Sequence, residues 1–344
     1  MRGRSILRVL LGLILLAAAQ PASSQVVKIK MGTLAPEGSP WHDVLLQIRE
    51  DWRVISGGKV TLRIYPGGVL GDEKDMIRRV RIRQLHAVAI TGSGLATIEP
   101  AISALQVPLM FDSYEELDYV RERLAPKLED LLEAKGFKVL NWGDAGWVHF
   151  FSKQPFSTLD ELRGLKLLTA AGDPRTEALY KDFGFNVVPL AYTDVLTSLQ
   201  TGMIDVVQGP PLYALIEQWF GLASHMVELR WAPLVGATLV RRETWDRIPP
   251  EWQGPMLDAA RSAGDRLRED IRRLGEESVP EMQKRGLAIV PIDEKRLAEW
   301  RAETLAAYPK LRGTYAPAEM FDEALRLRDE YRAARPPQQK VTPP

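Results

Sequence analysis

The chain has 344 residues, of which 45% are hydrophobic and 26% are charged, so a large folded core is expected and wholesale disorder is excluded. This length allows two domains of ordinary size. The formal net charge at pH 7 is zero, which argues against a nucleic-acid-binding protein, because such a protein needs a basic surface.

The N-terminus has the pattern of a secretory signal peptide. Arg2, Arg4 and Arg8 precede an apolar run over residues 9–19, and small residues follow at 22–24. The alternative is an uncleaved membrane anchor, but the run is too short for a comfortable span. We therefore expect residues 1–24 to be removed on export to the periplasm. The mature chain is expected to be mildly acidic and not to span the membrane, and without cysteine it can carry no lipid anchor or disulfide.

Strand and helix patterns then alternate along the chain. Residues 27–31 alternate as a strand, residues 41–52 have helical spacing, residues 60–64 alternate again, and a second helix is predicted around residues 76–80. This order is typical of an α/β sheet.

Two segments about one domain apart resemble each other. Residues 75–88 and residues 194–207 each read as an amphipathic helix, a break and an apolar strand. This echo predicts two similar α/β domains that face each other. Chance similarity of two helix–strand units is the alternative, because short periodic patterns are ambiguous.

A long amphipathic helix is predicted over residues 251–285. At 1.5 Å per residue it would span roughly 45 Å, which exceeds one domain, so the helix can cross both. We expect a first α/β domain of residues 25–145 plus about 234–272 and a second of residues 146–233 plus about 273–330. The proline-rich C-terminus, residues 331–344, is expected to be a disordered tail.

Five motifs carry a resemblance to a known family. They are YPGGVLG at residues 65–71, VPLMF at 107–111, LDELRGLKL at 159–167, VPLAYTD at 188–194 and LQTGMID at 199–205. Each motif is weak alone, but their order and spacing are specific. In these segments the chain resembles the DctP-type substrate-binding subunits of TRAP transporters, the tripartite ATP-independent periplasmic carriers.

The resemblance implies a fold and a function. The fold is the periplasmic-binding-protein type, in which two α/β domains enclose a ligand cleft and a long helix crosses both. Binding closes the domains, and the closed form delivers the ligand to the membrane permease subunits. The resemblance implies no catalysis and no cofactor.

Departures from the family pattern bear on the ligand. The family's carboxylate-binding arginines correspond to Leu168 and Val148 here. A family asparagine corresponds to Gly209, and the acid before it to Gln208. Because burying a carboxylate without a cation costs several kcal/mol, we expect the ligand to be apolar or amphipathic.

Aromatic residues near these positions are further candidates for the cleft wall, although any single one of them is more often a core residue. The loop predicted at residues 91–95 follows a strand, and strand ends face the ligand crevice in such sheets. His149 is expected to be a hydrogen-bonded wall residue, with ligand contact as the alternative. The full set of candidate ligand-binding residues is Trp41, Glu73, Thr91, Gly92, Ser93, Trp142, Trp147, Val148, Leu168, Ala170, Gln208, Gly209, Pro210, Tyr213 and Trp231.

Other functions remain as alternatives at this stage. An enzyme on the same scaffold would need a nucleophile–base pair, and no such motif is readable. A periplasmic scaffold that binds other proteins would have lost the solute site. The four histidines are too scattered to predict a metal site. The basic run at residues 78–83 is expected to be a solvated face, with a docking patch for the permease as the alternative.

Overall fold

The strand–helix pattern of the N-terminal third forms a parallel layer. The computed structural model describes residues 26–335. In it, β1 pairs in parallel with β2 and β3. Ile29 and Met31 of β1 are buried while Lys28 and Lys30 are exposed, as the alternation predicts. The elements of this first domain are β1 (Val27–Thr33), α2 (Pro40–Ile55), β2 (Val60–Tyr65), α3 (Glu73–Arg81), β3 (Ala87–Thr91), α4 (Gly92–Ile98), the 3₁₀ helix η1 (Pro100–Gln106) and α5 (Tyr114–Ala134).

A second α/β layer is built on β5, which lies parallel to both β6 and β7. The predicted echo is present as structure, because α3–β3 and α8–β7 are both a helix, a break and a buried strand. The elements of this domain are α6 (Leu159–Arg163), β5 (Lys166–Ala170), α7 (Pro174–Asp182), β6 (Asn186–Leu190), η2 (Tyr192–Asp194), α8 (Val195–Thr201), β7 (Val206–Gly209), α9 (Pro211–Ile216), η3 (Trp219–Gly221), β8 (His225–Val227) and β10 (Ala288–Val290).

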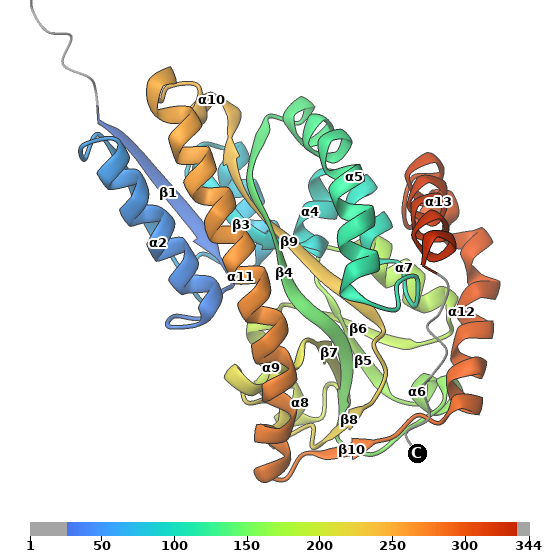
Figure 1. Cartoon of the computed structure of the whole chain (residues 1–344). Coiled ribbons are helices and arrows are strands. Elements are labelled where there is room, and N and C mark those ends of the chain that lie inside the picture. Colours follow the sequence, from blue (N-terminus) through green and yellow to red (C-terminus); the bar gives the residue numbers. More distant parts are fainter. Residues whose placement is uncertain (1–25, 336–344) are drawn as a thin grey trace, which may run out of the picture.

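Two long strands and one long helix join the domains. β4 (Phe137–Ser152) pairs antiparallel with β9 (Ala232–Arg241) over most of its length, and its end pairs with β7 and β8. The strand order β2-β1-β3-β9-β4-β7-β5-β6 therefore runs through both domains. After the short α10 (Arg242–Trp245), α11 (Pro250–Lys284) extends along both domains beside β4, as predicted (Figure 1).

The C-terminal helices correct two expectations. α12 (Glu294–Thr314) is followed by α13 (Ala318–Ala334), so the helix continues past residue 331, where a disordered tail was expected. α13 packs against α5 and η1 of the first domain rather than within the second. Its buried apolar face packs into the main core, and two polar contacts add to this: Arg332 forms an ion pair with Glu116 at 2.6 Å, and the Tyr119 hydroxyl donates to Glu330 at 2.5 Å. The expected signal peptide and residues 336–344 lie outside the described residues.

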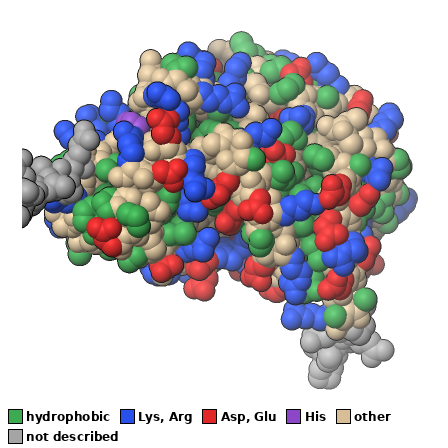
Figure 2. All heavy atoms as spheres, turned by 90° about the horizontal axis from the view of Figure 1, so that it is seen from above, with side chains coloured by type: hydrophobic (Ala, Val, Ile, Leu, Met, Phe, Trp, Pro, Cys, Tyr) green, Lys and Arg blue, Asp and Glu red, His purple; other side chains and the backbone are tan. Residues whose placement is uncertain are grey.

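The surface carries mixed charge. Figure 2 shows Lys and Arg side chains interspersed with Asp and Glu over the face seen from above. Among the described residues, no helix combines the length and the apolar character that crossing a membrane requires.

Candidate functional site

A cavity of about 140 Å³ lies where the two domains meet, and we call it the cleft cavity. The first domain contributes strand ends and helix starts from β1, α2, α3 and β3, and the second contributes β7, α9, η2 and η3. β4 and β9 form the floor between them. The residues that dominate its wall are Thr33, Leu34, Trp41, Val44, Glu73, Ala89, Thr91, Asn141, Asp144, Tyr192, Gln208, Gly209, Pro210, Tyr213, Trp219, Val235 and Thr238.

Glu73 is the buried acid that the first domain places in this wall. It begins α3, whose N-cap Asp72 accepts a hydrogen bond from the Glu73 backbone N–H at 2.8 Å. Its carboxylate accepts from the Thr91 N–H at 2.6 Å, from the Thr91 hydroxyl at 2.9 Å and from the Gly94 N–H at 2.9 Å. Burial raises the pKa of Glu73 to about 7, although these donors favour the charged form.

These bonds correct the prediction of a ligand-binding loop at residues 91–95. Gly92–Ile98 is helix α4 with Thr91 as its N-cap. The backbone donors of Thr91 and Gly94 are directed to Glu73 rather than to a ligand. A Cβ on Gly94 would lie 2.6 Å from Glu73 Oε2, so glycine is required for this close approach. Gly92 and Ser93 do not line the cavity.

Aromatic rings form the opposite wall. The Trp41 ring of the first domain meets Tyr213 of the second edge-to-face, with centroids 6.0 Å apart. Tyr213 contacts Trp219 at 5.1 Å, and Trp219 stacks on Tyr192 at 6.3 Å. Burial raises the pKa of the Tyr192 and Tyr213 hydroxyls above the ordinary value, so both remain neutral donors.

Gly209 lets Trp219 reach the cavity wall. A Cβ at Gly209 would lie 2.8 Å from Trp219 Cζ3, so a larger residue at this position would displace the ring. The neighbouring Gln208 is held by a buried chain of hydrogen bonds. The Tyr180 hydroxyl donates to Gln208 Oε1, and Trp231 Nε1 donates to the Tyr180 oxygen at 3.2 Å.

The second acid of the wall, Asp144, is neutralised by arginines. It lies on β4 next to an irregularity in the pairing with β9. Arg121 of α5 binds it at 2.5 Å and Arg272 of α11 at 2.6 Å, and both arginines also bind Asp118. Burial opposes ionisation of Asp118, but its bonds to Arg272 and the charge of Arg121 outweigh this and lower its pKa. The network fixes α5 and α11 to the point where β4 crosses between the domains.

The cleft cavity therefore offers no cation to a ligand. Among the described residues that line it, none is Lys, Arg or His. One of its two acids is paired with arginines and the other has a pKa near neutrality. Its volume is close to that of a cavity that holds benzene, about 150 Å³. The wall therefore combines aromatic rings with a small number of neutral hydrogen-bonding groups.

The structure brings together seven of the sequence-predicted residues at the cavity: Trp41, Glu73, Thr91, Gln208, Gly209, Pro210 and Tyr213. Sequence reasoning missed Tyr192 and Asp144. Tyr192 lies inside the motif at 188–194, and a lone acid within the apolar stretch of β4 was the available signal for Asp144.

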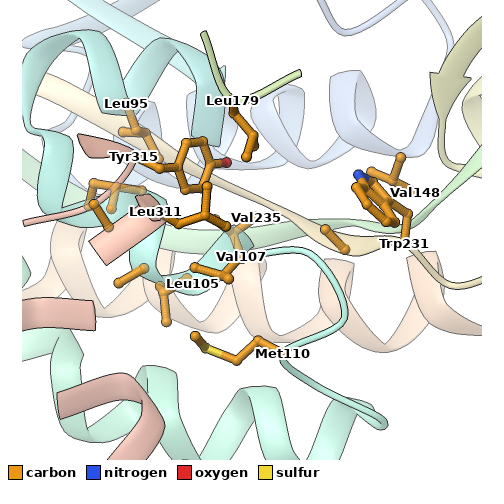
Figure 3. Packing of buried hydrophobic residues seen from close by; sticks show 14 of the residues in the cluster. Leu95, Leu105, Val107, Met110, Val148, Leu179, Trp231, Val235, Leu311 and Tyr315 are labelled. Atoms are coloured by element: carbon orange, nitrogen blue, oxygen red, sulfur yellow. The ribbon is translucent and has the colours of Figure 1, made fainter. Parts of the chain in front are cut away.

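The other predicted residues lie elsewhere. Leu168 is fully buried in the core of the second domain, and Val148 packs beside Trp231 in the main core (Figure 3), so neither is part of the cavity wall. Trp142 donates to Glu129 at 2.9 Å, and Ala170 lies at the end of β5. Trp147 and His149 line a neighbouring cavity instead.

Comparison with known proteins gives a consistent family. Residues 31–313 match the family model described as bacterial extracellular solute-binding protein, family 7, DctP. The chain is 24% identical over 293 residues to the 2,3-diketo-L-gulonate-binding periplasmic protein YiaO of Escherichia coli K12, covering 83% of this chain and 87% of that protein. It is also 24% identical over 313 residues to the C4-dicarboxylate-binding periplasmic protein DctP of Rhodobacter capsulatus, covering 85% and 93% respectively.

Solved structures support the fold. The sugar acid binding protein DctPAm of Advenella mimigardefordensis, solved with galactonate, matches with a TM-score of 0.83 at 18% identity, covering 89% of this chain and 99% of that chain. A TRAP periplasmic solute-binding protein of Xanthobacter autotrophicus, with bound β-D-galacturonate, matches with a TM-score of 0.81 at 20% identity, covering 88% and 99%.

Proposed function

The chain belongs to family 7 of the bacterial extracellular solute-binding proteins, and from the lining of the cleft cavity we propose that it captures an apolar or amphipathic ligand there. It is a solute-binding subunit of a TRAP transporter and not an enzyme. We further propose that it acts in the periplasm and delivers its ligand to the permease subunits in the membrane.

The observation that carries the ligand proposal is the absence of a cation from the described wall of the cleft cavity. A carboxylate that enters such a cavity loses its hydration and gains no opposite charge, which costs several kcal/mol. Aromatic rings from Trp41, Tyr213 and Trp219 instead offer contact area to an apolar group.

The proposed ligand class differs from the acidic ligands of two relatives. YiaO is named for 2,3-diketo-L-gulonate, and DctPAm was solved with galactonate. The resemblance implies that such ligands are held by arginines at positions where this chain has Val148 and Leu168. Both side chains are packed in the core here, which leaves no space for a charged group beside them. We infer that ligand selection has moved to the ring-lined side of the cleft.

The test is native mass spectrometry of the protein purified from the periplasm of its own organism, followed by solvent extraction of the bound molecule. An apolar or amphipathic molecule in the extract would support the proposal. A sugar acid or dicarboxylate in the extract would refute the ligand class but leave the transport function intact. The test variant is Tyr213→Ala, which removes one of the aromatic rings that line the cleft cavity. This variant is expected to reduce the amount of co-purified ligand at least ten-fold.

A further inference from the structure

A second cavity, of about 410 Å³, adjoins the cleft cavity. It lies between the middle of β4, the start of α5, α9, the segment after β8, and helices α11 and α12. Ala145 and Pro210 belong to the walls of both cavities. The two cavities therefore meet at Ala145 and Pro210, and a ligand that extends past these two residues would reach from one cavity into the other.

The wall of the second cavity contains buried hydrogen-bond donors without acceptors. Trp147 is 4% exposed, and among the described residues its Nε1 has no hydrogen-bond partner. Arg301 Nε is likewise buried and unpartnered, although the same guanidinium binds Asp112 at 2.7 Å. The Tyr114 ring contacts the Trp147 ring in a tilted arrangement, with centroids 5.3 Å apart. The Tyr114 oxygen accepts a hydrogen bond from the Trp147 backbone N–H, which leaves its O–H proton available. A buried donor without an acceptor is costly and calls for a ligand oxygen.

One cation in this wall is also unpaired. Arg272 is held by Asp118 and Asp144, and Arg301 by Asp112, but within the described part of the chain no carboxylate lies within ion-pair distance of Arg230. Arg230 is exposed at the rim of this cavity, and its guanidinium carbon lies 5.8 Å from the Trp147 ring centroid.

The remaining ionisable groups of the second cavity do not supply the missing acceptor. Glu228 and Glu276 are exposed at the rim, where water solvates them. The His149 side chain lies 3.3 Å from the Val227 carbonyl, and burial lowers its pKa to about 4, so it is neutral at pH 7. The unsatisfied groups inside are thus the donors of Trp147 and Arg301, and the exposed guanidinium of Arg230 adds a positive charge at the rim that suits a planar oxyanion.

We propose that the second cavity binds the anionic head group, a carboxylate or similar oxyanion, of the same ligand whose apolar part occupies the cleft cavity. This inference rests on the proposed function and narrows it to an amphipathic acid. It also separates the two parts of the ligand, since the cleft cavity excludes charge and the second cavity attracts it.

The test uses acetate, octanoate and octan-1-ol as probes of the full-length mature protein, followed by ¹⁵N NMR of the tryptophan indole N–H groups. Trp147→Phe keeps an aromatic ring but removes the indole N–H, so the signal that disappears in this variant is assigned to Trp147. We expect acetate and octanoate, but not octan-1-ol, to shift the Trp147 indole signal. We expect octanoate to bind at least about ten-fold more tightly than either other probe, because only octanoate fills both cavities and gains a charge-assisted hydrogen bond.

Substitutions of single arginines separate the contribution of the anionic head group from that of the alkyl chain. Arg230→Gln should reduce octanoate affinity about ten-fold and leave octan-1-ol unchanged, whereas Arg81→Gln, an exposed arginine on α3, should change neither. The inference is overturned if octanoate leaves the Trp147 signal unmoved, or if it binds no more tightly than acetate, which would mean a separate small anion. Failure of the proposed function would give a different result. In that case neither octanoate nor octan-1-ol would shift the indole signals of Trp41 or Trp219, while acetate would still shift the Trp147 signal.

Discussion

The ionisation of Glu73 is set by a balance between burial and hydrogen bonding. Three donors from Thr91 and Gly94 favour its carboxylate, and its position in the closed wall of the cleft cavity favours the neutral acid. An apolar ligand that displaces the remaining water would shift this balance further toward the acid. We therefore expect proton uptake and ligand binding to be coupled at this residue.

Stability should fall with rising pH because of Glu73. A carboxyl group with a folded pKa of about 7 and an ordinary pKa of 4.5 contributes stability fully below pH 4.5 and loses it as pH rises through 7. Relative to Glu73→Gln, we expect the unfolding free energy of the wild type to decline by up to about 3 kcal/mol over this range. Urea unfolding of both proteins at pH 5 to 8 measures this decline in unfolding free energy. Glu269→Gln, a substitution of an exposed glutamate, is the control. Parallel curves for wild type and Glu73→Gln would contradict the assignment.

Gly209 gives a second prediction at the residue scale. Gly209→Ala places a methyl group 2.8 Å from Trp219, so the ring must move, and we expect a loss of about 1–3 kcal/mol in unfolding free energy. Near-ultraviolet circular dichroism should report the displaced ring. Gly221→Ala is the matched control, because no atom lies within 4 Å of its added Cβ. Equal effects of the two substitutions would show that Trp219 is not tightly packed over Gly209.

Residue positions in the site were harder to predict than the family motifs. The resemblance and the aromatic pattern proposed Gln208, Gly209 and Tyr213 as cleft residues, and all three line the cleft cavity. Neither the resemblance nor the pattern showed that Leu168 and Val148 point into the core, because side chains alternate across a strand and a one-residue difference in register reverses the face. Which aromatic ring fills the space left by a lost arginine depends on tertiary packing, which no local pattern encodes.

At the scale of elements, α11 is held by a close approach to β4. A Cβ on Gly264 would lie 2.8 Å from Asn141 Cβ and 3.1 Å from the Trp142 carbonyl oxygen. The helix can therefore lie directly on the strand that joins the domains. Asn141 strengthens this contact, since its Nδ2 donates to the Ala260 carbonyl at 3.0 Å.

Two glycines of α11 should respond oppositely to alanine. Alanine favours the helix by roughly 1 kcal/mol over glycine, so Gly275→Ala, with no atom within 4 Å of the added Cβ, should stabilise the protein by about 0.5–1 kcal/mol. Gly264→Ala gains the same helix propensity, but its added methyl group must separate α11 from β4. We therefore expect a net loss of about 1–3 kcal/mol in unfolding free energy. Thermal unfolding of both variants measures the difference. A stabilised Gly264→Ala would show that the contact is loose.

Elements with strong periodicity were predictable, and the C-terminal helices show the limit of such patterns. The apolar spacing of residues 251–285 predicted α11 closely, because one continuous stripe must face the protein. The position of α13 depends on Arg332 reaching Glu116 and on Tyr119 reaching Glu330, contacts more than two hundred residues apart. No local pattern reports such partners, so the end of the second domain could not be set from the sequence.

At the scale of the whole molecule, a small number of contacts join the two domains across the cleft. Trp41 meets Tyr213 across the cleft, the Arg175 guanidinium donates to the Ala96 carbonyl at 3.4 Å, and the Tyr192 backbone donates to Asp72. These contacts are few and weak compared with the cores of the domains. A ligand that touches both walls would add contacts that exist only in the closed form, and so would shift the equilibrium toward it.

Closure should therefore depend on ligand and on the cross-cleft contacts. We expect small-angle X-ray scattering to show a smaller radius of gyration when the ligand extracted from the periplasm is added back to the emptied protein. Trp41→Ala removes the ring contact with Tyr213, so it should enlarge the ligand-free protein and weaken binding by about ten-fold. Trp142→Phe, which alters a tryptophan outside the cleft cavity, should do neither. Identical scattering with and without saturating ligand would mean that the domains do not move, and that the cleft cavity must fill by local motion of its aromatic wall.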